Sequence, residues 1–183
     1  EFIDSIATFT KIQNGLKVAG LSGDDLARTF DAIYASAQKN GVAIDDLAKL
    51  YSRVAQLQKG LSANSQSVAK FTDGVAVALR VAGTSSTEAS GALLQLSQLL
   101  GAGTVRLEEF NSVNEGARPI LEAVAAGLQE AGGSVANLRK LVEAGKVSSA
   151  AFFQAFLAGL PTLEAKLKDA SDTTDSAMTR MKN

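Results

Sequence analysis

The sequence predicts an all-α fold, a multi-helix bundle of about eight or nine short to medium helices. Two observations lead to this prediction. Apolar residues recur at three- and four-residue steps along most of the 183 residues, and glycines or small polar clusters separate the periodic segments. No stretch of useful length shows the alternation of a half-buried strand. With 46% hydrophobic and 20% charged residues, the chain has enough apolar surface for a packed core.

Five helices are predicted in the first half of the chain. They are expected at Ile3–Val18, from Ser22 to Asn40, from Asp45 to about Gly60, and at Ser65–Val81 and Thr87–Leu100. The Ser22 hydroxyl is placed to cap the second helix, and Asp25 three residues later resembles a capping box. Asn40-Gly41 supplies the left-handed stop with which helices often end.

Shorter helices are predicted in the second half of the chain. They are expected at Leu107–Asn114, Pro119–Ala131, Ser134–Glu143 and Ser149–Lys168. Pro119 fits a first helical turn, because the N–H that proline lacks has no partner there. The last helix should break or kink near Gly159 and Pro161.

The chain also contains an internal repeat. Residues 16–20 (LKVAG) match residues 79–83 (LRVAG) at an offset of 63, and the same offset aligns Asp45-Asp46 with Glu108-Glu109. Chance similarity among Ala/Leu-rich helices is the alternative. The matched glycines and acidic pairs favour a duplicated helical hairpin, with lobes at 1–83 and 84–170.

Composition excludes most catalytic chemistry. The chain has no His and no Cys, which removes the commonest general base, the commonest metal ligands and every Ser–His or Cys–His pair. We therefore expect no enzyme activity, no catalytic residues, no cofactor and no metal site. A net charge of −1, with the two signs intermixed, also argues against a sequence-specific nucleic-acid binder.

Several short motifs have structural explanations. Ser67 and Lys70 fit the Ser-x-x-Lys pattern, but no Lys-Thr-Gly follows, and a solvated helix surface is expected. The acidic pairs Asp24-Asp25, Asp45-Asp46 and Glu108-Glu109 fall in first helical turns, where the macrodipole favours negative charge. Gly101-Ala-Gly103-Thr is too short for a phosphate-binding fingerprint. The basic residues of the C-terminal third are expected on solvated faces: Arg139, Lys140, Lys146, Lys166, Lys168, Arg180 and Lys182.

Two uncharged stretches, Ala89–Val105 and Val147–Leu163, bear on membrane contact. Each has 17 residues, fewer than the roughly 20 that span a bilayer, and both contain polar or helix-breaking residues. Buried core helices are predicted, and transient membrane insertion is the alternative.

One ordered set of segments resembles a known family. It runs from Leu94-Gln-Leu-Ser-Gln-Leu-Leu-Gly-Ala-Gly103 into Val105-Arg-Leu-Glu-Glu-Phe-Asn-Ser-Val113, and then through Pro119 to Leu138-Arg-Lys-Leu-Val-Glu-Ala-Gly-Lys-Val147. This resembles the tape measure domain found toward the N-terminal side of tail tape measure proteins of long-tailed bacteriophages and prophages. The resemblance covers roughly residues 16–183. Phe110 departs from the leucine usual there, and residues 114–118 form a loose version of the turn before the proline.

The resemblance implies a structural role. Residues 1–183 would form a single helical tape measure domain, with 171–183 as a helix or linker leading to the remainder of the parent chain. Such proteins assemble as homo-oligomers in the tail lumen of the virion, after synthesis in the host cytoplasm. Their length sets tail length, and they take part in tail assembly and genome ejection. The implied partners are tail tube, tail tip or baseplate and tail assembly chaperone proteins, with membrane contact only during infection. The alternatives are a helical adaptor domain of a cellular protein and a membrane-active helical domain.

Overall fold

The computed structural model of the chain describes residues 2–169, and the all-α prediction is confirmed there. The helices are α1 (Phe2–Val18), α2 (Gly23–Asn40), α3 (Ile44–Gln56), α4 (Ser65–Ala82), α5 (Ser86–Gly101), α6 (Leu107–Gly127), the 3₁₀ turn η1 (Gln129–Ala131), α7 (Val135–Glu143) and α8 (Ser149–Ala158). A further helical stretch covers 160–169. Within the described part of the chain, the only β pairing is an isolated bridge between Thr104 and Ser148. The segment predicted to lead onward, 171–183, lies outside the described residues.

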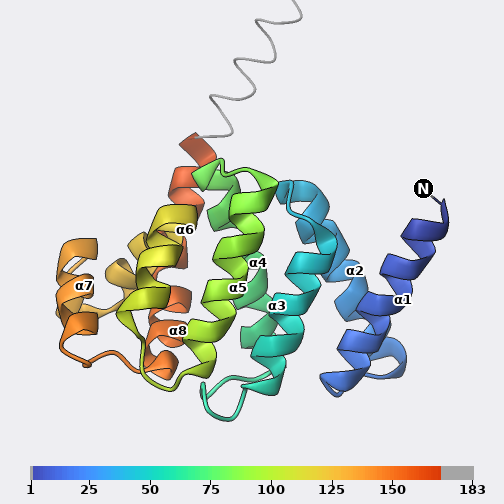
Figure 1. Cartoon of the computed structure of the whole chain (residues 1–183), viewed down its shortest axis with the longest axis horizontal. Helices are drawn as coiled ribbons and strands as arrows, with labels where there is room; N and C mark the ends of the chain where they lie inside the picture. Colours follow the sequence, from blue (N-terminus) through green and yellow to red (C-terminus); the bar gives the residue numbers. More distant parts are fainter. Residues whose placement is uncertain (1, 170–183) are drawn as a thin grey trace, which may run out of the picture.

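The helices form a row that runs from α1 at one end to α7 at the other (Figure 1). Helices two apart in the sequence pack together along the row, as α1 does with α3 and α2 with α4, and both α5 and α7 pack on α6. The largest contact joins α6 to α8. Buried apolar side chains from Ile12 to Leu163 form one continuous core cluster. The division into lobes at 1–83 and 84–170 remains a prediction.

The repeat predicted from the sequence coincides with the observed helix boundaries. Helices α5 and α6 begin 63 residues after α2 and α3 respectively, at Ser86 and Leu107. Gly20 and Gly83, which end the matched LKVAG and LRVAG segments, both have positive φ angles, of 96° and 64°. In each unit the first helix also contacts the third, α1 with α3 and α4 with α6. The repeated unit therefore consists of three helices, one more than the predicted hairpin.

Local sequence explains most helix ends, with one correction. Gly41 ends α2 in the left-handed conformation at φ 68°, as predicted. Ser22 precedes α2, but its side chain makes no capping hydrogen bond. The next residue, Gly23, has a left-handed φ of 56° where a capped helix would have a helical angle. With this backbone conformation the Ser22 hydroxyl does not bond to the N–H groups of the first turn. Capping boxes occur instead at Asn64 and Ser85.

The break predicted between the helices at 107–114 and 119–131 is confirmed, because α6 is interrupted at a non-helical residue between them. Helix α6 continues to Gly127 through a break at Ala117 (φ −155°, ψ 55°), two residues before Pro119. Pro119 has no N–H to donate to the carbonyl four residues earlier, and its ring would clash with that carbonyl in a continuous helix, which explains the kink. The chain then leaves the helix at Leu128 in an extended conformation, and residues 129–131 form η1. The break predicted near Gly159 is confirmed, since that residue separates α8 from the stretch 160–169.

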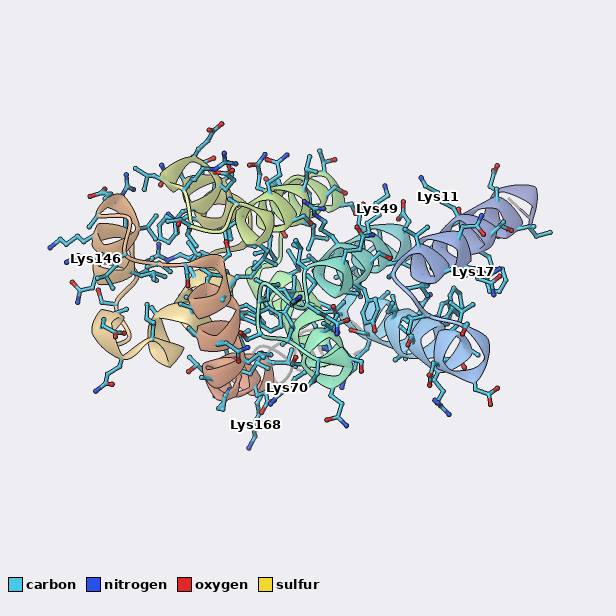
Figure 2. All side chains as sticks on the ribbon, turned by 90° about the horizontal axis from the view of Figure 1, so that it is seen from below. Lys11, Lys17, Lys49, Lys70, Lys146 and Lys168 are labelled. Carbon is cyan, nitrogen blue, oxygen red and sulfur yellow. The ribbon has the colours of Figure 1, made fainter. Side chains whose placement is uncertain are left out.

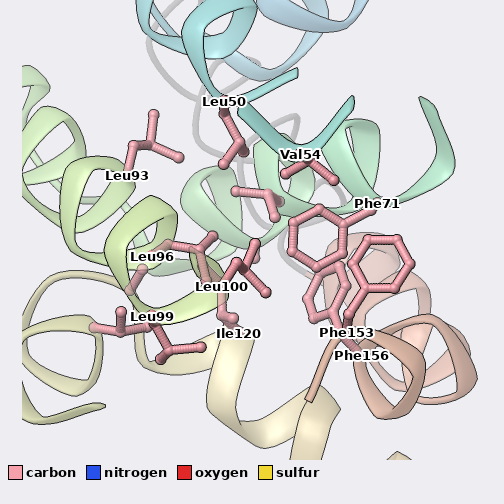
Figure 3. Close-up of a cluster of buried hydrophobic side chains, with 14 of the residues drawn as sticks. Leu50, Val54, Phe71, Leu93, Leu96, Leu99, Leu100, Ile120, Phe153 and Phe156 are labelled. Atoms are coloured by element: carbon pink, nitrogen blue, oxygen red, sulfur yellow. The ribbon is translucent and has the colours of Figure 1, made fainter. Parts of the chain in front are cut away.

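An aromatic cluster lies at the centre of the core (Figure 3). The ring of Phe71 on α4 stacks on Phe153, with centroids 4.7 Å apart, and meets Phe156 edge-on at 4.9 Å. Such pairs contribute about 0.5–1.5 kcal/mol each beyond their area burial. Gly74 makes room for α8, because a methyl group there would lie 2.5 Å from the Leu160 side chain and 2.9 Å from Phe156. The core thus joins the repeat unit α4–α6 to α8.

Candidate functional site

Asp and Glu are the only common metal-binding side chains that the chain offers, because the sequence has no His or Cys. Within residues 2–169 no cluster of three or more acidic side chains is arranged to hold an ion, and the sequence has no His or Cys. The absence of catalytic and metal site residues stays a prediction.

The Ser-x-x-Lys motif is part of a helix cap. The Ser67 hydroxyl accepts a hydrogen bond from the Asn64 N–H at 2.9 Å, and the Asn64 side chain accepts one from the Ser67 N–H at 2.9 Å. Lys70 is exposed one turn later. The predicted helix surface is confirmed, and the hydroxyl is committed to the start of α4.

The three acidic pairs occupy first turns, as predicted, but their partners differ. Asp25 forms an exposed ion pair with Arg28 in α2. Asp46 in α3 accepts a hydrogen bond from the Ser90 hydroxyl of α5, so it joins two helices. Glu109 in α6 pairs with Arg106. Neither α3 nor α6 has a side-chain N-cap, so these carboxylates act near a helix start without capping it.

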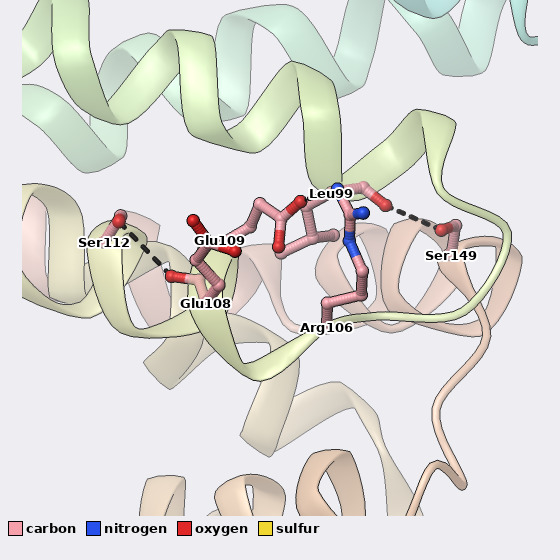
Figure 4. A network of polar contacts seen from close by, with 6 residues as sticks. All are labelled: Leu99, Arg106, Glu108, Glu109, Ser112 and Ser149. Atoms are coloured by element: carbon pink, nitrogen blue, oxygen red, sulfur yellow. Dashed lines mark hydrogen bonds and ion pairs between the residues drawn. The ribbon is translucent and has the colours of Figure 1, made fainter.

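Glu109 is the most enclosed charge of the described chain (Figure 4). Its side chain is 2% exposed, whereas that of its partner Arg106 is 62% exposed. The second carboxylate oxygen of Glu109 is buried and has no hydrogen-bond partner among the described residues. Burying a carboxylate without partners costs free energy, and the ion pair with Arg106 offsets part of that cost. The sequence predicts that Glu109 lies in the first turn of a helix, but it does not indicate that this side chain is buried.

Backbone and side-chain hydrogen bonds tie the same region together. The Ser149 hydroxyl donates to the Leu99 carbonyl at 2.7 Å, which links the start of α8 to the end of α5 (Figure 4). The Val105 N–H donates to the Val147 carbonyl at 2.9 Å, and the Ser149 N–H to the Gly103 carbonyl at 2.8 Å. The Gly101–Thr104 segment is therefore a structural connection between the end of α5 and the start of α8.

A groove of about 520 Å³ lies between α2 and α4. Its walls include Ile33 and Ala69, and Tyr51 of α3 lies at its base. Burial raises the pKa of Tyr51 above its ordinary value of 10.0, and a side-chain hydrogen bond with Thr29 partly offsets this. At the rim, the Ser36 hydroxyl donates to Asp73 at 2.6 Å. Sequence reasoning gave no sign of this groove, because its residues come from three helices.

Charged side chains are spread over the molecule (Figure 2). The labelled lysines lie at both ends and in the middle of the row, on several different helices. Two of the basic residues of the C-terminal third are paired: Arg139 with Glu143 at 3.2 Å, and Lys166 with Glu122. Arg180 and Lys182 lie outside the described residues. The labelled lysines are therefore distributed along the row and are not gathered on one helix.

The two uncharged stretches are core helices. Leu96 and Leu99 in α5, and Phe152 and Phe153 in α8, are fully buried. Within residues 2–169 no helix combines the length and the apolar character needed to cross a membrane. This confirms that the two stretches are core helices.

Comparison with known proteins identifies the family. No curated protein and no solved structure matches the chain. A family model described as "Tape measure protein" matches residues 1–183. The match spans every segment on which the resemblance rested and agrees with the all-helical fold. The chain therefore belongs to the tape measure protein family and is a structural component of phage tails.

Proposed function

We propose that this domain is a structural assembly module of a phage tail tape measure protein, and that it works by association without breaking any bond. The observation that carries the proposal is the family match over residues 1–183. Through its parent chain the domain contributes to tail length determination, tail assembly and genome ejection. It lies in the tail lumen of the virion, and in the host cytoplasm during assembly.

The contacts of the fold are of the kind that an assembly module needs. Its helices are joined through apolar packing and backbone hydrogen bonds, and the buried charge of Glu109 is held by Arg106. Short helices in a row leave long outer faces for other chains, as in other helical arrays. The proposed partners are copies of the same chain and the tail tube, tail tip or baseplate and tail assembly chaperone proteins.

The measuring role is tested in the parent phage by removing helix from the region downstream of this domain. An α-helix rises 1.5 Å per residue, so a deletion of about 100 helical residues should shorten tails by roughly 150 Å. Tail lengths are measured by electron microscopy of purified particles. A duplication of the same segment serves as the opposite control and should lengthen tails by the same amount. Tails of unchanged length in both mutants would refute the measuring role.

The assembly role of the domain itself needs a separate test. Replacing Gly127 by Val in the parent protein should separate α6 from α8, because even a methyl group at this position meets the backbone of α8. Tail yield should fall sharply, whereas Gly91→Ala, at an open position in α5, should leave it unchanged. Normal tail yield from a protein with an unfolded domain would contradict the proposed assembly role.

A further inference from the structure

A groove of about 290 Å³ lies between α1 and α3. The buried side chains of Ile12 on α1 and Ala48 on α3 line it, and Gly15 of α1 leaves it open because it has no side chain. An apolar hollow between two packed helices is the kind of surface that receives a further helix in helix-in-groove recognition. This α1–α3 groove shares no residue with the groove between α2 and α4.

Positive charge surrounds the α1–α3 groove. Lys11, Lys49 and Arg53 line it, and Asp45 is the only acidic residue among those that line it. All three basic side chains are exposed, and none of them forms an ion pair with a described residue. Lys11 and Lys49 lie on the same side of the molecule (Figure 2). This excess of positive charge is local, since the whole chain has a net charge of −1.

The guanidinium group of Arg53 has a second neighbour. A methyl group at Gly101 would lie 2.9 Å from one of its nitrogens, so Arg53 reaches the C-terminal end of α5. The helix dipole stabilises a cation at that end. Lys11 and Lys49 are therefore the charges of the groove that are open to a partner.

The second repeat unit shows what packs on the corresponding helices. Helices α4 and α6 correspond to α1 and α3 at the offset of 63, and α8 packs on both of them. Gly74, which corresponds to Lys11, is buried against Phe156 of α8 and Leu160 just beyond it. In the first unit α5 corresponds to α8 at the same offset, and it packs on α3 without a comparable contact with α1. The place that a helix fills in the second unit is thus an open groove in the first.

We propose that the α1–α3 groove binds an acidic amphipathic helix of another tail protein. The proposal rests on the proposed function, in which this domain works by association. The packing of α8 in the second unit supports a helical partner, and the apolar lining of the groove requires an apolar face on that helix. Carboxylates beside this face would meet Lys11 and Lys49, which select an acidic partner over a basic one.

The test is fluorescence anisotropy of a labelled helical peptide of about 18 residues, with leucines on one face and glutamates beside them. Titration with the 183-residue chain should give saturable binding with a dissociation constant below about 100 μM, and added salt should weaken it. A peptide with lysine in place of glutamate should not bind, because its charge has the wrong sign. One with serine in place of leucine should not bind either, because it lacks the apolar face.

Charge reversal locates the contact on the protein. Lys49→Glu should raise the dissociation constant at least about tenfold, because it places a carboxylate against those of the peptide. Lys70→Glu is the matched control on α4, away from the groove, and should leave binding unchanged although it changes the net charge by the same amount (Figure 2). Both lysines are exposed, so both variants should stay folded, and far-UV circular dichroism checks this.

Absence of saturable binding by the acidic peptide overturns the proposal. Equal binding of the serine-containing peptide also overturns it, because attraction by charge alone would then suffice. Equal weakening by Lys70→Glu places the contact outside the groove, and equal or stronger binding of the lysine-containing peptide overturns the acidic class of partner. None of these results bears on tail length or tail yield, which the downstream deletions and Gly127→Val test separately.

Discussion

Gly127 of α6 and Gly159 at the end of α8 allow the backbones of the two helices to touch. A methyl group at Gly127 would lie 1.8 Å from the Ala155 carbonyl oxygen, and one at Gly159 would lie 1.8 Å from that of Ala123. Each helix thus places an Ala four residues before a Gly, and the two pairs meet in antiparallel order. This reciprocal contact lies within the largest helix–helix interface of the fold.

Gly127→Ala and Gly159→Ala should each destabilise the domain strongly. The added methyl group meets backbone, which cannot rotate away, so the helices must separate at a cost of about 3 kcal/mol or more. The free energy of unfolding is measured by urea denaturation. Gly91→Ala is the control: nothing lies within 4 Å of the added carbon, so the helix should gain about 0.5–1 kcal/mol. Equal effects at the three positions would contradict this account of the close contact.

The caps of α5 and α2 should respond differently to the same substitution. The Ser85 hydroxyl accepts a hydrogen bond from the Glu88 N–H at 3.3 Å, so Ser85→Ala should cost about 1 kcal/mol of unfolding free energy. Ser22 makes no side-chain cap hydrogen bond, and Ser22→Ala should change stability by less than about 0.5 kcal/mol. Thermal unfolding of both variants gives the comparison. A larger loss for Ser22→Ala would restore the capping role that the sequence predicted for it.

Removing Arg106 should destabilise the domain, and also removing the charge of Glu109 should reverse most of that loss. Arg106→Ala leaves a carboxylate buried without its counter-charge and should cost about 1–3 kcal/mol, a value reduced by the solvent exposure of Arg106. Adding Glu109→Met to that variant removes the buried charge and should recover most of the loss. Denaturation of the single and double variants checks this. A double variant no more stable than Arg106→Ala would show that the charge of Glu109 is not the cause.

Stability at alkaline pH should depend on Tyr51. Because burial raises the pKa of Tyr51 in the folded chain, its contribution is complete below about pH 10, where the unfolded chain also keeps the proton. That contribution is lost as pH rises from there through the folded-state pKa. The wild-type chain should therefore lose more unfolding free energy between about pH 9 and pH 12 than Tyr51→Phe does. Parallel pH profiles for the two proteins would exclude this role of Tyr51.

Much of this fold could be predicted from the sequence, because its signals are local. Helix periodicity, the glycine stop at Gly41 and the break at Gly159 depend on residues within a few positions of each other. The repeat was visible because the same local signals recur at a fixed offset. The prediction was wrong at Ser22, where capping depends on local backbone geometry as well as on residue type.

By itself the sequence determined the helical class, the positions of most helices, the repeat and the ordered motifs of the family. It also determined what the chain lacks, since absent His and Cys are facts of composition. Only the tertiary structure decided that Glu109 is buried, that Gly127 and Gly159 meet, and that the side chains of Ile6 and Phe9 are about half exposed. The physical reason is that burial and close approach depend on which helices pack together. Residues such as Asp46 and Glu109 look alike along the chain and differ only in their neighbours in space.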